Sequence, residues 1–539
     1  ANDDNPGSEA LPLLTISRGA ELAQAGDTVI VKAGIYRESV MPAYSGDDGN
    51  PITFQANPGD RVVVSGAEEI TGWQQLTQEL SEGNPNHANI YYKDINWVPR
   101  LLYEDGVKCR KARKPDYGWW CVTASSDSYH VIDSVHLTQA DPNYWVGAEM
   151  YFVNYDPAES DDAVVTAYDP ATHTVTVSPW VATEYGNDGP EAGEDYYYLS
   201  NKIVLMDHPG EWCCKSLGGG QYRLYVWPHD SGSPSGHMFE AGKNILPLLN
   251  WAGRSGIVYD GFEVRHCNGH NAVGSTGSAS DVVVSNCIIH DNNHFGVLFT
   301  TVNGGTLRNS LVIDNGYGVV INVYCHGIDI YENEIARNVE EDGVSIIHGN
   351  SDIYVARNYI HHHCFWGHPD SFQVYSQQAL YGDCDGITLD SNVMMYGFQA
   401  GLIQYTTNIL ATNNVCVGSV QGLFQLGLGA HDTMIDHNVF ALSGISPFSL
   451  DPSQPNHSLT NNIYYDGNHG PFYHASSTQG YASDHNIFCH ASGLPAEQII
   501  IWNGVNSQFA AYVAASGQDT HSYYADPLFV NAPVFITPT

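Results

Sequence analysis

The sequence has few basic residues. Lys and Arg total 20 of 539 residues against 59 Asp and Glu, which gives a formal net charge of −39. A field of that sign repels nucleic acids and anionic membrane surfaces, so we expect neither as a partner. No Lys follows Lys243, and neither Lys nor Arg follows Arg357. A long stretch without sites for trypsin-like proteases suits a secreted protein, so we expect an extracellular location.

Long apolar runs and paired cysteine motifs are also missing. No run of about 18 apolar residues occurs, so we expect no membrane insertion. The cysteines form no C-x-x-C motif, which argues against a zinc ribbon or a redox dithiol. Cys109 and Cys121 flank a short loop and can pair, whereas most other cysteines are expected to be buried as small hydrophobic side chains.

The residues that are abundant indicate a packed β protein. Charged residues make up only 15% of the chain, hydrophobic residues make up 43%, and there are 53 Gly and 34 Tyr. This composition is typical of a turn-rich β fold and not of an acidic disordered chain.

A short β pattern centred on Asn repeats from about residue 254 onward. The spacing is 22 to 25 residues, apart from one step of 34 residues between Asn358 and Asn392. A period of this length without a helical pattern predicts one solenoid coil per repeat. The central residues are Asn286, Asn309, Asn333, Asn358, Asn392, Asn414, Asn438, Asn462 and Asn486.

Recurring Asn side chains have a physical role in such a solenoid. Coils stacked about 4.8 Å apart let Asn side chains hydrogen-bond along the stack and satisfy buried amides at one turn. The pattern therefore predicts an all-β fold, a right-handed parallel β-helix with a ladder of Asn residues.

The first 250 residues contain a cap and an interruption. Residues 17–40 predict a short amphipathic helix from Ser17 and then a strand, so the helix can cover the open end of the solenoid. Residues 80–250 lose the rhythm, and alternation in EMYFVNY and HTVTVSP predicts an antiparallel insertion. We therefore divide the chain into 1–79 (cap and first coils), 80–250 (β-rich insertion) and 251–539 (main coils).

Several segments resemble known enzymes. GDTVIVKAGIYRESV (26–40), PITFQA and GAEEITGW resemble the opening of carbohydrate-active parallel β-helix enzymes, namely the alginate lyase and chondroitinase B group and certain β-helix xylosidases. Residues 102–116 and 206–228 resemble segments of secreted β-helix glycoside hydrolases. The resemblance implies extracellular work on a polysaccharide. In that pattern a further strand is usual at each end, so we expect trimmed ends or self-association through the chain ends.

Two acidic residues fall at one position of successive coils. Aligning HFGVLFT, YGVVIN, DGVSII, DSFQVY, AGLIQY and QGLFQL predicts a column of Phe295, Tyr317, Asp342, Asp370, Ala400 and Gln421. Carboxylates stacked at about 4.8 Å cannot both ionise freely, so one keeps a proton at neutral pH. An acid and a carboxylate side by side are what glycosidic bond cleavage requires. We predict Asp342 and Asp370 as catalytic residues, with Glu341 as a third candidate.

Polar and aromatic residues surround this pair in the sequence. The longest step of the repeat, from Asn358 to Asn392, includes Asp370. Inserted loops on a regular scaffold often carry function. The predicted substrate-binding residues are Tyr317, Arg337, His348, Arg357, His363, Trp366, His368, Gln373 and Gln377.

The segment HHHCFWGHPD (361–370) also invites a metal interpretation. Consecutive residues of a strand face opposite sides, so at most two of its first three His can share an ion. Calcium is an alternative, from the loops NDDNPG and YGDCDG (381–386). Solvated loops remain the default for both, so we expect no required cofactor, with Ca²⁺ as an option and no assigned metal ligand.

Three functions remain open from sequence. A glycoside hydrolase uses the paired carboxylates on a neutral or weakly charged polysaccharide. A polysaccharide lyase uses Arg337 and Arg357 with His363, although the acidic coils would bind an anionic polymer poorly. A structural or glycan-binding β-helix, such as a sheath or fibre, needs no catalytic residue.

Overall fold

A computed structural model describes residues 1–47, 49–153, 160–181, 189–275, 277–338, 341–363, 369–420, 422–444, 448–450, 454–466, 472–475, 480–490 and 500–530. The described residues fall into two compact units. The first comprises the described residues of 1–66, 244–363 and 369–530, and the second those of 67–243. The sequence predicts the insertion at 80–250.

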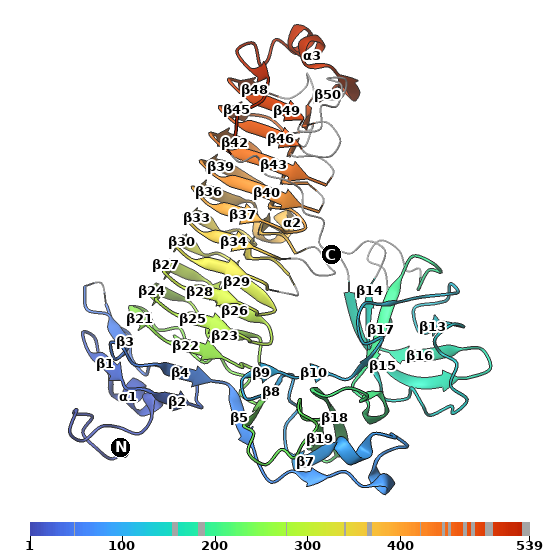
Figure 1. Cartoon of the computed structure of the whole chain (residues 1–539). Helices are drawn as coiled ribbons and strands as arrows, with labels where there is room; N and C mark the ends of the chain where they lie inside the picture. Colours follow the sequence, from blue (N-terminus) through green and yellow to red (C-terminus); the bar gives the residue numbers. More distant parts are fainter. Residues whose placement is uncertain are drawn as a thin grey trace. The chain divides into compact units, whose positions relative to one another are not determined.

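The first unit is a parallel β-helix, as predicted. Strands from successive coils pair in parallel and build three sheets along the solenoid (Figure 1). Sheet 1, in the described residues, comprises β1 (Thr28–Val31), β3 (Ile52–Ala56), β21 (Ile257–Asp260), β24 (Ala279–Ser285), β27 (Val302–Arg308), β30 (His326–Tyr331), β33 (Ser351–Ala356), β36 (Cys384–Asp390), β39 (Thr406–Thr412), β42 (His431–Asp436), β45 (His457–Thr460) and β48 (Tyr481–Asp484).

The other two sheets complete each coil. Sheet 2 comprises β2 (Gly34–Tyr36), β4 (Val62–Ser65), β22 (Glu263–Arg265), β25 (Ile288–His290), β28 (Leu311–Ile313), β31 (Glu334–Ala336), β34 (Tyr359–His361), β37 (Val393–Met395), β40 (Val415–Ser419), β43 (Val439–Ser443), β46 (Ile463–Asp466), β49 (Ile487–His490) and β52 (Tyr523–Tyr524). Sheet 3 comprises β23 (Asn271–Gly274), β26 (Phe295–Thr300), β29 (Tyr317–Asn322), β32 (Val344–Ile347), β35 (Phe372–Tyr375), β38 (Gly401–Ile403), β41 (Phe424–Leu426) and β44 (Phe448–Leu450).

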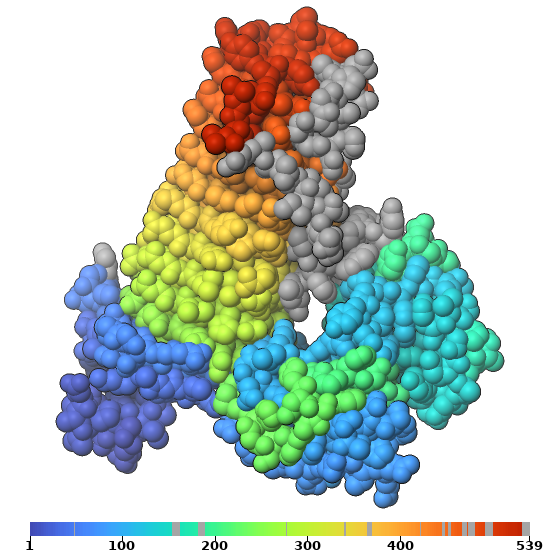
Figure 2. All heavy atoms as spheres, viewed as in Figure 1, coloured from blue at the N-terminus to red at the C-terminus, as the bar shows by residue number. Residues whose placement is uncertain are grey.

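One continuous apolar core fills the solenoid. On sheet 3, for example, Val344 and Ile346 point inward to the core while Ser345 between them belongs to the outer face. Figure 2 shows the coils as contiguous bands of atoms from yellow through orange to red. Helix α1 (Ile16–Leu22) begins after the N-cap Thr15 and adds Ile16 and Ala20 to the same core. The predicted N-terminal cap is therefore confirmed.

The second unit leaves the solenoid pairing uninterrupted. Strand β3 pairs directly with β21 and β4 with β22, although the second unit separates them in sequence. The chain departs after Gly66, where a Cβ would lie 2.6 Å from the carbonyl oxygen of His266. Glycine fits this close backbone approach because it has no side chain.

The second unit is mainly antiparallel. Strand β14 (Glu149–Val153) pairs with β15 (Ser160–Asp169), and β15 pairs with β16 (Thr174–Ser178). Strand β14 comprises EMYFV and β16 comprises TVTVS of the two alternating segments, so the predicted antiparallel insertion is confirmed. Cys109 and Cys121 are both free thiols, so the disulfide that their spacing allows is not formed. Among the described residues, we find no helix that is both long and apolar enough to cross a membrane.

The Asn ladder is present between sheets 1 and 2 with two corrections. From Asn333 to Asn462, each backbone N–H and each Nδ2 donates to Oδ1 of the next rung, as from Asn333 to Asn358 at 3.0 Å. Asn286 and Asn309 are not rungs. They adopt left-handed backbone conformations with φ of 54° and 48°. The buried positions that follow them are Cys287 and Ser310.

Candidate active site

The predicted acidic column lies where the turn after sheet 2 enters sheet 3. Residues Val344 and Phe372 are register partners in β32 and β35, so Asp342 and Asp370 occupy equivalent positions two residues earlier. The backbone N–H of Asp370 donates to Oδ1 of Asp342 at 2.9 Å, which brings the two aspartates into contact. This stacking agrees with the register deduced from the sequence.

Both carboxyl groups are almost completely buried. Asp342 is 2% exposed and Asp370 is 0% exposed. Oδ2 of Asp342 accepts a 2.7 Å hydrogen bond from the hydroxyl of Ser345. Oδ1 of Asp370 accepts a 3.0 Å hydrogen bond from the backbone N–H of Gln399. Hydrogen bonds from the same coil and from the following coil therefore hold the two carboxyl groups in fixed orientations.

Burial determines the protonation of Asp342. Loss of solvation raises the pKa of the Asp342 carboxyl well above its ordinary value, and the charges of Asp370 and then Glu341 raise it further. Hydrogen bonds from Ser345 and from the Asp370 backbone oppose this pKa shift without reversing it. Asp342 therefore favours the protonated form. Glu341 precedes it and is half-buried.

In the coil after Asp370, the residue at this position of the column differs from the prediction. Gln373 pairs with Leu402, so the partner of Asp370 is Gln399 and not Ala400. Aligning DGVSII with AGLIQY places Gly401 at the position of Gly343. Gly401 instead aligns with Phe372 in the core, and a Cβ on it would lie 2.6 Å from the ring of Phe424. Gln421 lies outside the described residues.

Aromatic side chains lie in the acidic column one coil before Asp342. Tyr317 begins β29 and occupies the position equivalent to Asp342 one coil earlier. Its half-buried ring stacks on His294 with centroids 4.7 Å apart and meets Phe295 edge-on at 4.8 Å. Gln373 is half-buried on β35 beside Ser345, the residue that contacts Asp342. The structure therefore brings Tyr317 and Gln373 close to the acidic pair.

His348 and Gln377 form a separate group beyond the C-terminal ends of strands β32 and β35. The backbone N–H of Gln377 donates to Nδ1 of His348 at 3.4 Å, and the His348 ring stacks on Tyr381 at 4.4 Å. Gln377 precedes helix α2 (Gln378–Tyr381). His348 follows β32, six residues after Asp342, which is about 20 Å of extended chain. These two residues can contact only a long substrate that also reaches the aspartates.

The predicted basic residues are engaged elsewhere. Arg337 makes a bidentate pair with Asp314 of the preceding coil, with N···O distances of 2.9 and 2.8 Å. Arg357 lies at the turn between sheets 1 and 2, where its Nε donates to Glu332 at 3.0 Å. The turn that carries Arg357 is not the turn that carries the aspartates. The structure therefore places Arg357 away from the acidic pair, whereas Arg337 begins the turn that leads to Asp342 and is paired with Asp314.

His363 is a buried structural residue. It is 0% exposed, and its Nε2 lies 3.1 Å from the carbonyl oxygen of Ile335. Asn292, Asn315 and Asn338 bond equivalent carbonyls in earlier coils through Nδ2, so His363 continues a second ladder. Burial lowers the pKa of His363 to about 4, so the ring is neutral. Its predicted contact with substrate is corrected. Trp366 and His368 lie outside the described residues.

Sequence reasoning missed Ser345 and Gln399. Ser345 occupies the only outward position between two core residues of DGVSII, which was a usable signal. Gln399 could be found only after the register around Gly401 was known. Neither NDDNPG nor YGDCDG contributes to a group of three potential metal ligands among the described residues.

Comparisons with known proteins agree with this fold. Residues 249–392 match the family model described as a right handed beta helix region, which supplies the hand of the solenoid. The solved structure of XylC in complex with xylose is 14% identical, with a TM-score of 0.57 over 93% of this chain and 85% of that one. A structure described as a glycoside hydrolase is 15% identical, with a TM-score of 0.54 over 96% of this chain and 98% of the other. At these identities the likeness is one of fold.

A curated relative matches only a short segment. The uncharacterized protein YwoF of Bacillus subtilis (strain 168) is 40% identical over 65 residues, which are 12% of this chain and 14% of that protein. This chain therefore spans only a small part of the relative's length. The right-handed parallel β-helix is confirmed, and the resemblance to carbohydrate-active β-helix proteins holds at the level of fold.

Proposed function

We propose that this chain is a secreted glycoside hydrolase that cleaves a neutral or weakly charged polysaccharide. The observation that carries the proposal is the contact between Asp342 and Asp370 on adjacent coils, in which one carboxyl group favours its protonated form. Two structures that share the fold over most of this chain also support it, since one contains xylose and the other is described as a glycoside hydrolase.

The two aspartates take different roles in the proposed reaction. Asp342 keeps its proton because of burial, so it acts as the general acid that protonates the leaving oxygen. Asp370 supplies the carboxylate, which either attacks the sugar or activates water, and the Gln399 N–H helps to hold its negative charge. Glu341 contributes its negative charge, which helps to raise the pKa of Asp342 and so keeps the acid protonated.

The surroundings suit an uncharged sugar. Tyr317 presents an aromatic ring one coil before the acid, and Gln373 supplies amide groups beside Ser345. Sugar rings combine apolar faces with hydroxyl groups, so an aromatic ring and an amide can bind both parts. The net charge of −39 disfavours an anionic polymer. We propose that the reaction needs no cofactor, and that calcium, where it binds, affects stability.

Burial of the pair favours a second candidate function. Both aspartates are at most 2% exposed, so they can serve as a proton-sharing pair that fixes the turn of a non-catalytic, glycan-binding or structural β-helix. The lyase alternative has less support, because Arg337 and Arg357 are each paired with a carboxylate and the His363 ring is fully buried.

One assay separates these functions. The full chain is incubated with neutral and uronate-containing polysaccharides, with and without calcium, and both reducing ends and ultraviolet absorbance are recorded. A hydrolase releases reducing ends without absorbance. A lyase adds an unsaturated uronate chromophore, and a structural protein produces neither signal. Reducing ends from a neutral polymer support the proposal, whereas the other two results contradict it.

A further inference from the structure

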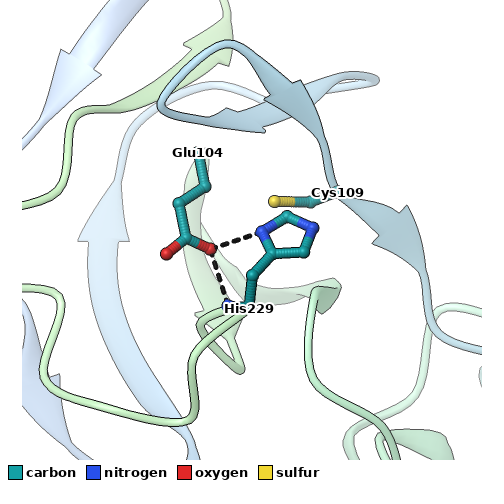
Figure 3. A group of neighbouring side chains, drawn as sticks. All are labelled: Glu104, Cys109 and His229. Atoms are coloured by element: carbon teal, nitrogen blue, oxygen red, sulfur yellow. Dashed lines mark hydrogen bonds and ion pairs between the residues drawn. The ribbon is translucent and has the colours of Figure 1, made fainter.

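Three potential metal ligands converge within the second unit. Glu104 ends β8 (Leu102–Glu104), Cys109 follows β9 (Val107–Lys108), and His229 follows β19 (Gln221–Val226). Strands β8 and β9 form an antiparallel hairpin. One ligand atom from each residue lies within 4.8 Å of the other two, and the three side chains point toward one another (Figure 3).

Two of these side chains are removed from solvent. Glu104 and Cys109 are each 3% exposed. Oε2 of Glu104 accepts a 2.8 Å hydrogen bond from the backbone N–H of His229 and lies 2.7 Å from Nδ1 of the same residue. Oε1 lies 3.5 Å from Nδ1 of His237. Within the described chain, the ion pairs of this buried carboxylate are therefore all with imidazoles.

In a second cluster of the same unit, lysine and arginine side chains compensate the carboxylates, so no metal ion is needed there. Asp116, Asp207, His208 and Glu211 also lie close together. There, Nζ of Lys114 is 2.6 Å from Asp116 and 2.5 Å from Asp207, and Arg110 is 2.6 Å from Glu211. Permanent positive charges thus compensate those carboxylates, and an added cation would compete with them. The Glu104 cluster holds no such lysine or arginine pair among its described contacts.

We propose that Cys109, His229 and Glu104 bind one zinc ion. Zinc takes thiolate, imidazole and carboxylate ligands at about 2.0–2.3 Å, whereas a thiolate is a poor ligand for calcium or magnesium. One thiolate and one carboxylate supply two negative charges, which match a divalent ion in a buried site. On binding, the Cys109 S–H bond breaks, a sulfur–zinc bond forms, and the proton passes to water.

The buried Cys109 thiol favours its protonated form until a cation binds. Burial, and then the charge of Glu104, raise the pKa of the Cys109 thiol. Without a cation the thiol stays protonated beside the carboxylate, and a metal ion reverses this preference. His229 is 38% exposed at its side chain, so one edge of the cluster is open for metal entry.

Two further potential ligands lie on the loop that carries His229. Glu104 also belongs to a second group of potential ligands with Asp230 and His237. His237 is oriented by Asp105, whose Oδ2 is 2.7 Å from Nδ1, and its Nε2 is 3.4 Å from Asp230. Asp230 or His237 can therefore complete a four-coordinate structural site. Zinc would fasten the 227–238 loop to the β8–β9 hairpin.

The test uses the full chain, freed of metal by a chelator, and Co²⁺ as a spectroscopic probe. We expect one cobalt per chain with a thiolate-to-cobalt charge-transfer band in the near ultraviolet, which zinc then removes by displacement. Cys109→Ser should abolish the band, and Glu104→Gln should weaken cobalt binding at least ten-fold. The matched control is Cys121→Ser, since Cys121 is a half-buried free thiol of the same unit and should leave the band unchanged.

Zinc should also raise the melting temperature of the wild type and of Cys121→Ser, but not that of Cys109→Ser. Circular dichroism in chelator establishes that each variant folds. If Cys109→Ser does not fold, His229→Gln carries the same comparison. A band that persists in Cys109→Ser overturns the proposal. So does cobalt bound without a thiolate band, as expected for adventitious binding at exposed histidines, or the absence of stoichiometric binding.

Discussion

The backbone N–H of Asp370 donates a 2.9 Å hydrogen bond to Oδ1 of Asp342, one coil earlier in the solenoid. The backbone N–H of Gln399 makes the equivalent bond to Oδ1 of Asp370 at 3.0 Å. These bonds hold two acidic side chains together in a buried position, where ionising both is unfavourable. The pair therefore titrates as one unit, and the pKa of Asp342 is raised above its ordinary value.

Asp342→Asn should keep or increase the stability at neutral pH. A carboxyl group with a raised pKa in the folded state stabilises the fold only while it is protonated. Wild-type stability is therefore lost as pH rises from the unfolded pKa of about 3.9 to the raised folded pKa, by up to about 1.4 kcal/mol for each unit of separation. Asparagine is uncharged and avoids this loss. Urea unfolding at several pH values measures the difference.

The pH dependence of wild-type and Asp342→Asn stability can contradict this prediction. At a pH below about 3.5 both proteins should have similar stability, because both side chains are then neutral. Asp281→Asn serves as the control for this pH dependence, since Asp281 is exposed on β24 of sheet 1, whereas burial raises the pKa of Asp329 on β30. If wild type and Asp342→Asn show the same pH dependence, Asp342 does not hold the proton.

The proposed hydrolysis should retain the anomeric configuration. Carboxyl groups on adjacent coils are separated by about 4.8 Å, close to the separation of about 5–5.5 Å in retaining enzymes and well below that of inverting ones. Nuclear magnetic resonance of the first product formed reports the configuration directly. An inverted product would mean that a different, more widely spaced pair of carboxyl groups performs the reaction.

Tyr317→Ala should weaken substrate binding more than it slows chemistry. The Tyr317 ring lies one coil before Asp342 and is held by His294 and Phe295. We expect KM to rise about ten-fold with kcat changed less than three-fold, because the ring contacts substrate equally before and during reaction. Tyr331→Ala on sheet 1 is the matched aromatic control and should change neither value. Equal kinetics for both variants would exclude Tyr317 from the binding surface.

Asn414→Ala should destabilise the solenoid without touching the acidic pair. Nδ2 of Asn414 donates to Leu389 and to Asn438, and its Oδ1 accepts from Asn392. Removing the side chain leaves several buried groups without partners, at about 1–3 kcal/mol each, so we expect a loss of about 3 kcal/mol or more in the free energy of unfolding.

The neighbouring Asn413 provides the control for this ladder. It is exposed and has φ of 59°, a conformation that glycine adopts without strain. Asn413→Gly should therefore change the unfolding free energy by less than about 1 kcal/mol. Similar losses for the two variants would mean that the buried rung has no special contribution to stability.

The sequence predicted the architecture because the solenoid repeats one local pattern. The rungs from Asn333 to Asn486 were identified by spacing alone, since the turn geometry recurs in every coil. Spacing failed at Asn286 and Asn309 because an Asn in a left-handed turn position looks the same as a rung one residue later. Contacts between coils distinguish the two positions, and the sequence does not contain them directly.

The candidate site was predictable only in part for a related reason. The contact between Asp342 and Asp370 followed from aligning two similar coils, DGVSII and DSFQVY. The next partner, Gln399, was missed because Phe424 fills the core over Gly401 and shifts the alignment by one residue. Arg357 and His363 were misplaced because nearness in sequence does not tell which turn, or which side of the coil, a residue occupies.

The most direct test of the proposed function is the reducing-end yield of wild type, Asp370→Asn and the control Asp329→Asn on a neutral polysaccharide panel. In Asp370→Asn the Oδ1 atom can still accept the Gln399 hydrogen bond, so the melting temperature should stay within about two degrees of wild type. We predict that its turnover falls by at least about a thousand-fold while Asp329→Asn remains active. Full activity in Asp370→Asn, or no activity in the wild type on any polymer, would contradict the account.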